Sequence, residues 1–349
     1  MSNLPISFPA LAIERPGAAV SLQQKTIASL DHDEALIRVS YASVNKMDPA
    51  LARMNFFNLP TPYVLGFDFS GEVVELGGEG GGLRVGDRVF GKTGAGGCFA
   101  GYIVTKQENA LPRGAVPAAE ASTFGIAFLT AYESLVIKGA LKPQGGDRHK
   151  DRWIYVAGAA GGVGHFAAQI AKICGLKVIG SGGKAASLDL LRKLRVDHII
   201  DYSKQDVAGE IMRVTGGKGV DIVYDSTYSA ASHTQSAAVI AAGGDYIRLG
   251  TAAQMARVGA ADVTAVVEGR GAKMIIGDLG RYSADPVYQA QTSRLMDGLK
   301  QAVAWYEEGK LKPVITQTVP FDAAALQQTF EGFGTNNVGK VVVRCDARS

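Results

Sequence analysis

The sequence has few cysteines, and they stand far from one another. Cys98, Cys174 and Cys345 are its three cysteines, and no CxxC pair occurs among its 349 residues. A disulfide framework or a thiolate zinc site needs more cysteines than these, at closer spacing. The histidines are equally scattered, at His32, His149, His165, His198 and His233. We therefore expect no metal site.

Basic runs and long apolar runs are also missing. Lys and Arg number 36 against 33 Asp and Glu, and proteins that bind nucleic-acid backbones cluster their cations, so nucleic acid is not an expected partner. No apolar run reaches the ~18 residues that a membrane span needs. Residues 1–17 lack the basic-then-apolar layout of a secretory signal. These absences favour a soluble, cytoplasmic protein with no membrane partner.

The chain length and the rhythm of its apolar segments predict two domains. Between residues 36 and 104, short apolar runs alternate with Gly- and Pro-rich turns, which is typical of a β-rich domain. From Trp153, six strand-like segments alternate with helical stretches, which indicates a doubly wound parallel sheet of the Rossmann kind. Strand-like "PVITQTVPF" and "GKVVVRC" come last. We expect an α/β fold in which the Rossmann domain (134–307) is inserted in the β-rich domain (1–133 and 308–349).

A glycine-rich turn follows the first of these six strands and opens a helix. In "GAAGGVG", Gly158, Gly161 and Gly164 are spaced as GxxGxxG. A β-carbon at such positions would keep the backbone away from a pyrophosphate, and the free amides at the helix start face the anion. The turn therefore predicts a dinucleotide site.

The second strand of this domain bears on which nicotinamide cofactor binds. An NAD site usually ends that strand with Asp or Glu, whereas "LKVIGSGGKAAS" ends in Ser181, two glycines and Lys184. Ser181 and Lys184 are suited to a 2′-phosphate, and Tyr202 is a possible further hydroxyl, so NADP(H) is favoured over NAD(H). The alternative is that Lys184 is a solvated residue at a helix start. Gly250, which ends "DYIRLG", is another candidate cofactor contact.

Several motifs occur in order along nearly the whole chain: "VNKMD" (44–48), "PYVLGFDFSGEVVELG" (62–77), "AGAAGGVG" (157–164), "TGGKGVDIVYD" (215–225) and "VGKVVV" (338–343). With them the sequence resembles the medium-chain dehydrogenase/reductase superfamily, in its zinc-independent quinone oxidoreductase branch, the zeta-crystallin-like enzymes. The resemblance implies a GroES-like catalytic domain beside a Rossmann domain, and a homodimer.

The resemblance also implies roles for particular residues. Asn45 would lie beside the nicotinamide and the substrate, and Thr130 would contact the nicotinamide end of the cofactor. The turn at Gly161, Gly162 and Val163 would hold the pyrophosphate.

Four positions depart from the family pattern. Ser187 stands where such reductases often carry a phosphate-binding lysine, and Ala50 stands where a tyrosine is common. Arg195 replaces the usual glycine of a turn, and Lys46 replaces a small or apolar residue.

In zinc alcohol dehydrogenases of the superfamily, a Cys and a His occupy the positions of Asn45 and Phe67, and neither residue here is a zinc ligand. Without a Lewis acid, hydride addition to a conjugated acceptor is easier than oxidation of a plain alcohol. Asn45 is the candidate donor to the acceptor's oxygen. Asp48 either orients Asn45 or forms a structural turn.

Three aromatic residues lie between two of these motifs: Phe56, Phe57 and Tyr63. They either wall an aromatic or quinone pocket or pack in the core. Taken together, the residues and the resemblance predict an NADPH-dependent, metal-free reductase. Its substrate would be a small-molecule quinone or enone, with hydride going to the quinone or to the β-carbon of the α,β-unsaturated carbonyl. Two alternatives stay open: a 2-enoyl thioester reductase, and a cofactor-binding protein with little turnover.

Overall fold

The structure, a computed structural model, describes residues 4–139, 141–143, 149–250, 261–280, 282, 286–334 and 337–346. It divides into unit 1, Met1–Ala127 with Leu299–Ser349, and unit 2, Phe128–Gly298. From the sequence we expected these divisions after residues 133 and 307. The chain leaves unit 1, builds unit 2 and returns to unit 1.

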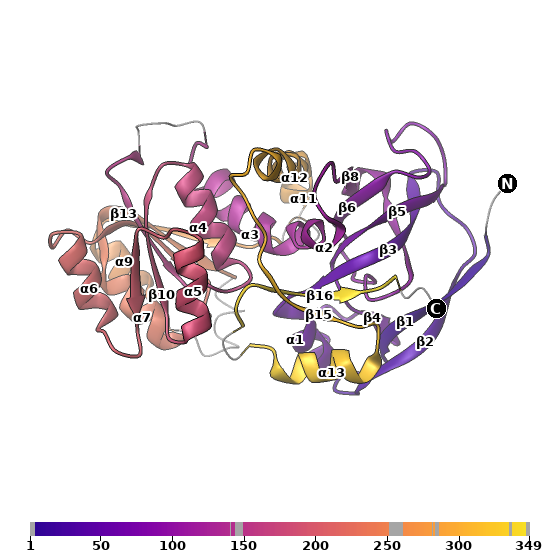
Figure 1. Ribbon diagram of the computed structural model, residues 1–349, viewed down its shortest axis with the longest axis horizontal. Coiled ribbons are helices and arrows are strands. Elements are labelled where there is room, and N and C mark those ends of the chain that lie inside the picture. Colours follow the sequence, from indigo (N-terminus) through magenta and orange to yellow (C-terminus); the bar gives the residue numbers. More distant parts are fainter. Residues whose placement is uncertain are drawn as a thin grey trace. The chain divides into compact units, whose positions relative to one another are not determined.

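Unit 1 is built on a seven-stranded sheet. Its order is β15-β16-β3-β5-β6-β8, and β7 also pairs with β3. The strands are β3 (Glu34–Val44), β5 (Asp68–Leu76), β6 (Arg88–Lys92), β7 (Tyr102–Lys106), β8 (Ala110–Pro112), β15 (Ile315–Val319) and β16 (Lys340–Arg344). β16 runs antiparallel to β3 with Val341 opposite Val44, as the yellow and indigo strands of Figure 1 show. The last strand of the chain thus lies beside the end of β3.

A second, three-stranded sheet of unit 1 has the order β2-β1-β4. It is formed by β1 (Ile6–Ile13), β2 (Val20–Ile27) and β4 (Tyr63–Val64). The short helical elements are α1 (Met47–Met54), η1 (Gln107–Asn109), α2 (Ala118–Ala121), η2 (Phe124–Phe128) and α13 (Ala323–Gly332). Leu11, Phe67, Phe69 and Phe99 belong to one buried core cluster, which the alternation of apolar residues in these strands produces.

Unit 2 contains a six-stranded sheet with the order β11-β10-β9-β12-β13-β14, and every neighbouring pair is parallel. The strands are β9 (Trp153–Ala157), β10 (Lys177–Gly182), β11 (His198–Asp201), β12 (Val220–Asp225), β13 (Ile240–Leu249) and β14 (Lys273–Gly277). In chain order this is 3-2-1-4-5-6, the doubly wound order of the Rossmann fold. The Rossmann prediction is confirmed.

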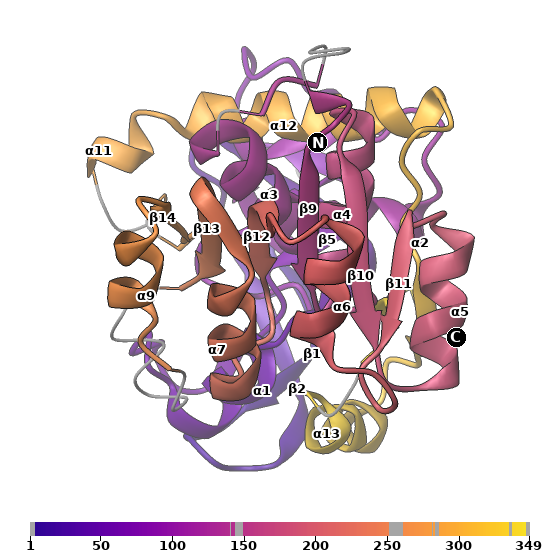
Figure 2. The same ribbon diagram turned by 90° about the vertical axis from the view of Figure 1, so that its left-hand side faces the viewer.

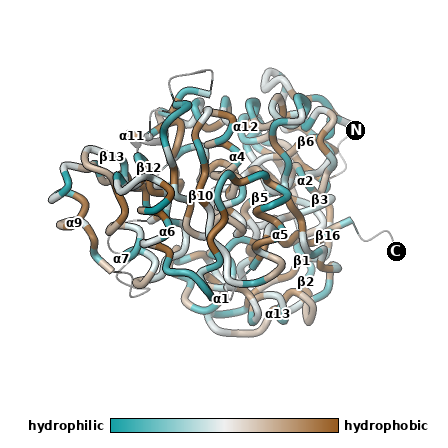
Figure 3. The backbone as a smooth tube through the Cα atoms, turned by 60° about the vertical axis from the view of Figure 1, so that its left-hand side comes forward, coloured by the Kyte–Doolittle hydropathy of each residue, from teal (hydrophilic) through white to brown (hydrophobic). Residues whose placement is uncertain are grey.

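Helices cover both faces of this sheet. The helical elements of unit 2 are α3 (Leu129–Tyr132), η3 (Glu133–Lys138), α4 (Gly164–Ile173), α5 (Ala185–Lys193), α6 (Val207–Val214), α7 (Ala230–Ala238), α9 (Thr264–Gly269), α11 (Pro286–Gln289) and α12 (Thr292–Glu307), which continues into unit 1. Figure 2 shows α6, α7 and α9 on one face, where Val207, Ile211 and Val267 pack on Val223 and Tyr246. Figure 3 shows hydrophobic segments, in brown, alternating with hydrophilic segments, in teal, along the chain.

The described part of the chain has no helix that is both long enough and apolar enough to cross a membrane.

Candidate functional site

The glycine turn of unit 2 joins β9 to α4, as predicted. Gly158 has a φ of +73°, and a β-carbon there would lie 3.0 Å from the Ser226 hydroxyl oxygen. A β-carbon on Gly164 would lie only 2.0 Å from the carbonyl oxygen of Gly158. The turn closes with the Gly161 N–H, which donates to that same carbonyl at 2.9 Å. These contacts require glycine at both ends of the turn.

The turn also meets the requirements of an anion site. Val163 directly precedes α4, a ten-residue helix, and the first N–H groups of a helix have no intrahelical acceptor. Gly161 and Gly162 precede Val163, so these two positions of the turn carry no side chain. The neighbouring strands β9 and β12 are where the strand order reverses, the place at which dinucleotides bind in this fold. The residues of the turn therefore fit a dinucleotide pyrophosphate.

The three residues predicted for the 2′-phosphate lie at the ends of the adjacent strands β10 and β11. Lys184 is exposed at the start of α5, and Tyr202 is half exposed, with its ring so close to Gly183 that a β-carbon there would lie 2.1 Å from it. Ser181 is buried, and its hydroxyl shares a hydrogen bond of 2.9 Å with the Tyr155 hydroxyl. Lys184 and Tyr202 are thus available to a ligand, whereas Ser181 already has a partner.

Sequence reasoning overlooked an acidic residue at this edge. Asp201 ends β11 opposite Gly182, so a carboxylate is present although the second strand carries none. It accepts hydrogen bonds from the Ser203 N–H and hydroxyl and lies 3.5 Å from the Lys204 ammonium. These partners lower the pKa of Asp201, with the Ser203 hydroxyl as the largest cause. The signal was in the third strand, where Asp201 directly precedes Tyr202 in the sequence.

The two other predicted cofactor contacts of unit 2 lie at different places in it. Gly250 directly follows β13, has a φ of +85° and donates its N–H to the Gly277 carbonyl at 2.7 Å. Thr130 is half-buried in α3. Both assignments stay predictions.

In unit 1, Asn45 follows β3 directly, and its side-chain amide is held at both ends. The Nδ2 group donates to Asp68 Oδ1 at 2.7 Å, and Oδ1 accepts from the Lys340 ammonium at 2.6 Å. All three residues are buried. Asp68 is the first residue of β5 and Lys340 the first of β16. The sequence identified Asn45 but not its two partners. Asp68 lies in the motif "PYVLGFDFSGEVVELG" and Lys340 in "VGKVVV", and each is a charged residue next to apolar residues.

The hydrogen-bond partners of the Asn45 side-chain amide are Ser43, Asp68 and Lys340, and Asp48 is not among them. Its carboxylate accepts the backbone N–H groups of Asn45 at 2.7 Å and Gly66 at 2.9 Å. It therefore ties the first turn of α1 to the segment before β5, which favours the structural alternative. Burial raises the pKa of Asp48 to about 7, because it outweighs the two N–H groups that favour the carboxylate.

Further ionisable groups surround the amide. Asp68 also accepts from the Ser43 hydroxyl at 2.9 Å and the Ile126 N–H at 3.0 Å. Burial raises the pKa of Asp68 to about 6, with Lys340 as the largest opposing cause. Burial lowers the pKa of Lys340 against the opposing effect of Asp68 and Asp48, and it lowers that of buried Lys92 likewise. Two carboxyl groups and two amines therefore share one poorly solvated region.

The aromatic residues predicted for a pocket wall have different surroundings. Tyr63 is buried, and its hydroxyl donates to the carbonyls of α1 at Leu51 or Ala52, at 3.1 and 3.3 Å. This placement favours core packing for Tyr63. Phe56 packs partly buried against the core and contacts Phe57 edge to face with ring centroids 4.9 Å apart. Phe57 is 41% exposed, so it is the aromatic residue of this segment that a ligand can reach.

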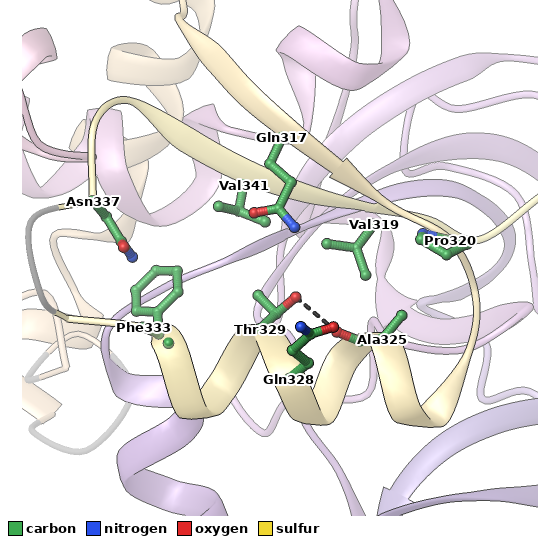
Figure 4. A pocket seen from close by; sticks show the side chains of 10 residues that line it. Gln317, Val319, Pro320, Ala325, Gln328, Thr329, Phe333, Asn337 and Val341 are labelled. Carbon is green, nitrogen blue, oxygen red and sulfur yellow. Dashed lines mark hydrogen bonds between the residues drawn. The ribbon is translucent and has the colours of Figure 1, made fainter. Parts of the chain in front are cut away.

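A separate hollow in unit 1, of about 510 Å³, lies between α13 and the strands β15 and β16 (Figure 4). Its lining combines Gln317, Gln328 and Asn337 with Phe333 and Val341. None of the residues predicted for the site lines it, and the described residues of the lining include no charged side chain. The hollow is therefore separate from the polar cluster around Asn45.

Within the ranges that the structure describes, no group of three or more His, Cys, Asp or Glu residues could hold a metal ion. The expectation of a metal-free site stays a prediction.

Comparison with known proteins agrees with this geometry. Residues 31–118 match the alcohol dehydrogenase GroES-like domain family, and residues 162–284 match the family described as zinc-binding dehydrogenase. The quinone oxidoreductase of Pongo abelii is 26% identical over 90% of this chain and 89% of its own. The chain belongs to the medium-chain dehydrogenase/reductase superfamily, in its quinone oxidoreductase branch. This result confirms the GroES-like prediction, and the superfamily's oxidoreductases use a nicotinamide cofactor, which the glycine turn fits.

Other known proteins are also similar to the chain. The 2-methylene-furan-3-one reductase of Solanum lycopersicum is 27% identical over 91% of this chain and 73% of its own. A phenolphthiocerol/phthiocerol polyketide synthase of Mycobacterium tuberculosis is 32% identical over 69% of the chain. The chain spans only about a tenth of that synthase, 11% of its length. The crystal structure of the CurK enoyl reductase shares the fold, with a TM-score of 0.79 at 24% identity, over 97% of this chain and 99% of its own.

Proposed function

We propose that the protein is an NADPH-dependent reductase that delivers hydride to a conjugated carbonyl compound, a quinone or an α,β-unsaturated carbonyl. The observation that carries the proposal is the Asn45 amide, buried and fixed by a carboxylate and an ammonium group. The similarity to a quinone oxidoreductase and to a 2-methylene-furan-3-one reductase supports it.

The proposed reaction has a defined electron balance. The reduced nicotinamide supplies a hydride, which carries two electrons. When the hydride adds to the β-carbon of an enone, the C=C π pair moves toward the carbonyl and leaves negative charge on its oxygen. An N–H donor aimed at that oxygen stabilises the developing charge, and a proton from water then completes the product. In unit 1, Asn45 is our candidate for that donor.

The preference for NADPH rests on the end of β10. Lys184 is exposed there and Tyr202 is half exposed beside Gly183, so an ammonium and a hydroxyl are available to a 2′-phosphate. We expect Lys184→Ala to raise the Kd of NADPH about tenfold, which is ~1.4 kcal/mol, and to leave the Kd of NADH unchanged. Lys193→Ala, an exposed lysine of the same helix, is the control. Equal changes for both cofactors would remove the phosphate role.

A second candidate substrate class is favoured by one observation. The polyketide synthase has the highest identity among the relatives described above, and we propose a 2-enoyl thioester as the alternative acceptor on that ground. Its hydride chemistry is the same, since a thioester carbonyl also takes up the developing charge.

The test is cofactor oxidation by purified protein across three acceptor panels: small enones, quinones and 2-enoyl thioesters. NADPH and NADH are compared, with chelator-treated and zinc-supplemented samples. Turnover of enones or quinones with an NADPH preference supports the first proposal, and turnover confined to thioesters supports the second. NADPH binding without turnover of any acceptor would instead point to a cofactor-binding protein. Activity that disappears on chelation and returns with zinc would refute the metal-free reaction.

A further inference from the structure

The orientation of the Asn45 amide is fixed by chemistry. An ammonium group only donates hydrogen bonds, and a carboxylate, the charged form that Asp68 takes opposite Lys340, only accepts them. The Asn45 oxygen therefore faces Lys340 and its nitrogen faces Asp68. The reversed amide would set NH₂ against the ammonium and oxygen against the carboxylate. Only one of the two amide orientations is thus compatible with these neighbours.

The charges contact the amide instead of each other. Lys340 donates to Asn45 Oδ1 at 2.6 Å and to the Val44 carbonyl at 3.0 Å, and the described residues include no ion pair within 4.0 Å between Lys340 and Asp68. Burying two charges has a large desolvation cost, and a direct ion pair offsets part of it. Here the Asn45 amide lies between Lys340 and Asp68. The two charged groups are therefore placed to orient the amide and do not form a direct ion pair.

One amide hydrogen remains weakly engaged. Asn45 Nδ2 carries two hydrogens, and Asp68 Oδ1 takes one at 2.7 Å. The other is directed to the Ser43 carbonyl at 3.4 Å, near the limit of a hydrogen bond. That hydrogen is the one a ligand oxygen can take over at little cost.

We propose that Lys340 and Asp68 are positioning residues that fix and polarise the Asn45 amide, so that its second N–H donates to the carbonyl oxygen of the hydride acceptor. The proposal rests on the reductase function proposed above and extends it to two residues that do not contact substrate. Lys340 draws electron density toward Asn45 Oδ1 and makes the N–H groups stronger donors, since hydrogen bonds in a chain polarise one another. Asp68 holds the first N–H and thereby sets the direction of the second.

The experiment uses three variants of the full chain. Lys340→Met removes the ammonium group and keeps an apolar chain of similar length. The double variant Asn45→Asp with Asp68→Asn exchanges the amide and the carboxylate, so it conserves net charge and size but leaves no side-chain N–H at position 45. Lys92→Met is the matched control, because Lys92 is also buried and interacts electrostatically with Asp68 but is not a hydrogen-bond partner of Asn45. For each variant, kcat, the KM of the acceptor, the Kd of NADPH and the Tm are measured.

We expect Lys340→Met to lower kcat by roughly 10- to 100-fold, the loss seen when a residue that orients a metal-binding side chain is replaced in a metalloenzyme. The double variant should lower kcat by about 10²- to 10³-fold, the cost of one lost oxyanion donor. In both, the Kd of NADPH stays within about threefold of wild type. Lys92→Met should lower the Tm comparably to Lys340→Met while kcat stays within about threefold. Comparing kcat at similar Tm in the two lysine variants distinguishes the loss of a hydrogen-bond donor from a general loss of stability in the core.

Two results overturn the inference while the proposed function stands. One is an active wild type with a double variant that retains wild-type kcat. The other is a loss of kcat in Lys340→Met that Lys92→Met reproduces at equal Tm, because the effect would then be structural. A wild-type protein that reduces none of the three acceptor classes refutes the proposed function and the inference together.

Discussion

Replacing Gly164 by alanine tests the cofactor turn most directly. The added β-carbon would lie 2.0 Å from the Gly158 carbonyl oxygen, 2.7 Å from its carbonyl carbon and 2.9 Å from the Ala159 Cα. All three atoms belong to the backbone, so no side chain can rotate away. A normal contact at ~3.4 Å requires the two ends of the turn to separate by roughly 1.4 Å, a form of overpacking that costs about 1–3 kcal/mol.

The expected outcome has two parts. Unit 2 comprises residues 128–298, and for a domain of that size each kcal/mol shifts the Tm by about 2–4 °C, so the Tm should fall by roughly 2–12 °C. The displaced turn should also raise the Kd of NADPH at least ~10-fold, because its N–H groups no longer converge on the pyrophosphate. Calorimetry and a titration of NADPH fluorescence measure the two effects.

Gly269→Ala is the matched control. Gly269 ends α9 in the same unit, and a β-carbon there would have nothing within 4 Å, so neither the Tm nor the Kd should worsen. If Gly164→Ala gives the same Tm and the same Kd of NADPH as Gly269→Ala, the reasoning is refuted. The backbone would then accommodate the added β-carbon without opening the turn.

Two further predictions concern stability. Arg195 has a φ of +53°, in a conformation that costs a non-glycine residue about 1–2 kcal/mol. Glycine loses ~0.5–1 kcal/mol in chain entropy, so Arg195→Gly should raise the free energy of unfolding by up to about 1.5 kcal/mol. Arg195→Ala, which keeps the strain, should give no gain in urea unfolding. Burial raises the pKa of Asp48 to about 7, so the folded state holds a proton that the unfolded chain releases near pH 4. The contribution of Asp48 to the free energy of unfolding should therefore fall by about 1.4 kcal/mol for each pH unit between about pH 4 and 7. Asp48→Asn should remove this contribution from the pH dependence of the free energy of unfolding. An unchanged pH dependence would mean that the Asp48 carboxyl group is ionised in the folded state throughout this range.

Local patterns in the sequence were sufficient to predict unit 2. Its strands are short apolar runs, and the glycine turn occupies consecutive positions, so both can be recognised without knowing which segments meet. The residue at 195 was recognised as a departure from glycine, and the structure gives it the left-handed backbone that a glycine would adopt.

The partners of Asn45 could not be predicted in the same way. Asp68 and Lys340 reach it because β5 and β16 flank β3 in the sheet, and nothing in the neighbourhood of "VNKMD" specifies those pairings. The role of Asp48 was also beyond sequence reasoning, because a carboxylate that binds backbone N–H groups looks the same in sequence as one that binds a side chain. Tyr63 was ambiguous for a similar reason, since core and pocket both accept an aromatic ring.

The order in which the chain is synthesised has a consequence for the Asn45 cluster. Lys340 and Asn45 lie 295 residues apart, and all of unit 2 is made between them. At ~5–20 residues per second, that interval is roughly 15–60 s on the ribosome. Asp68 follows Asn45 by 23 residues, so for most of this interval both exist without the Lys340 ammonium group, while the nucleotide-binding unit can complete its fold. A nascent or truncated chain that stops before β16 would thus carry the glycine turn but lack the ammonium group that orients the amide.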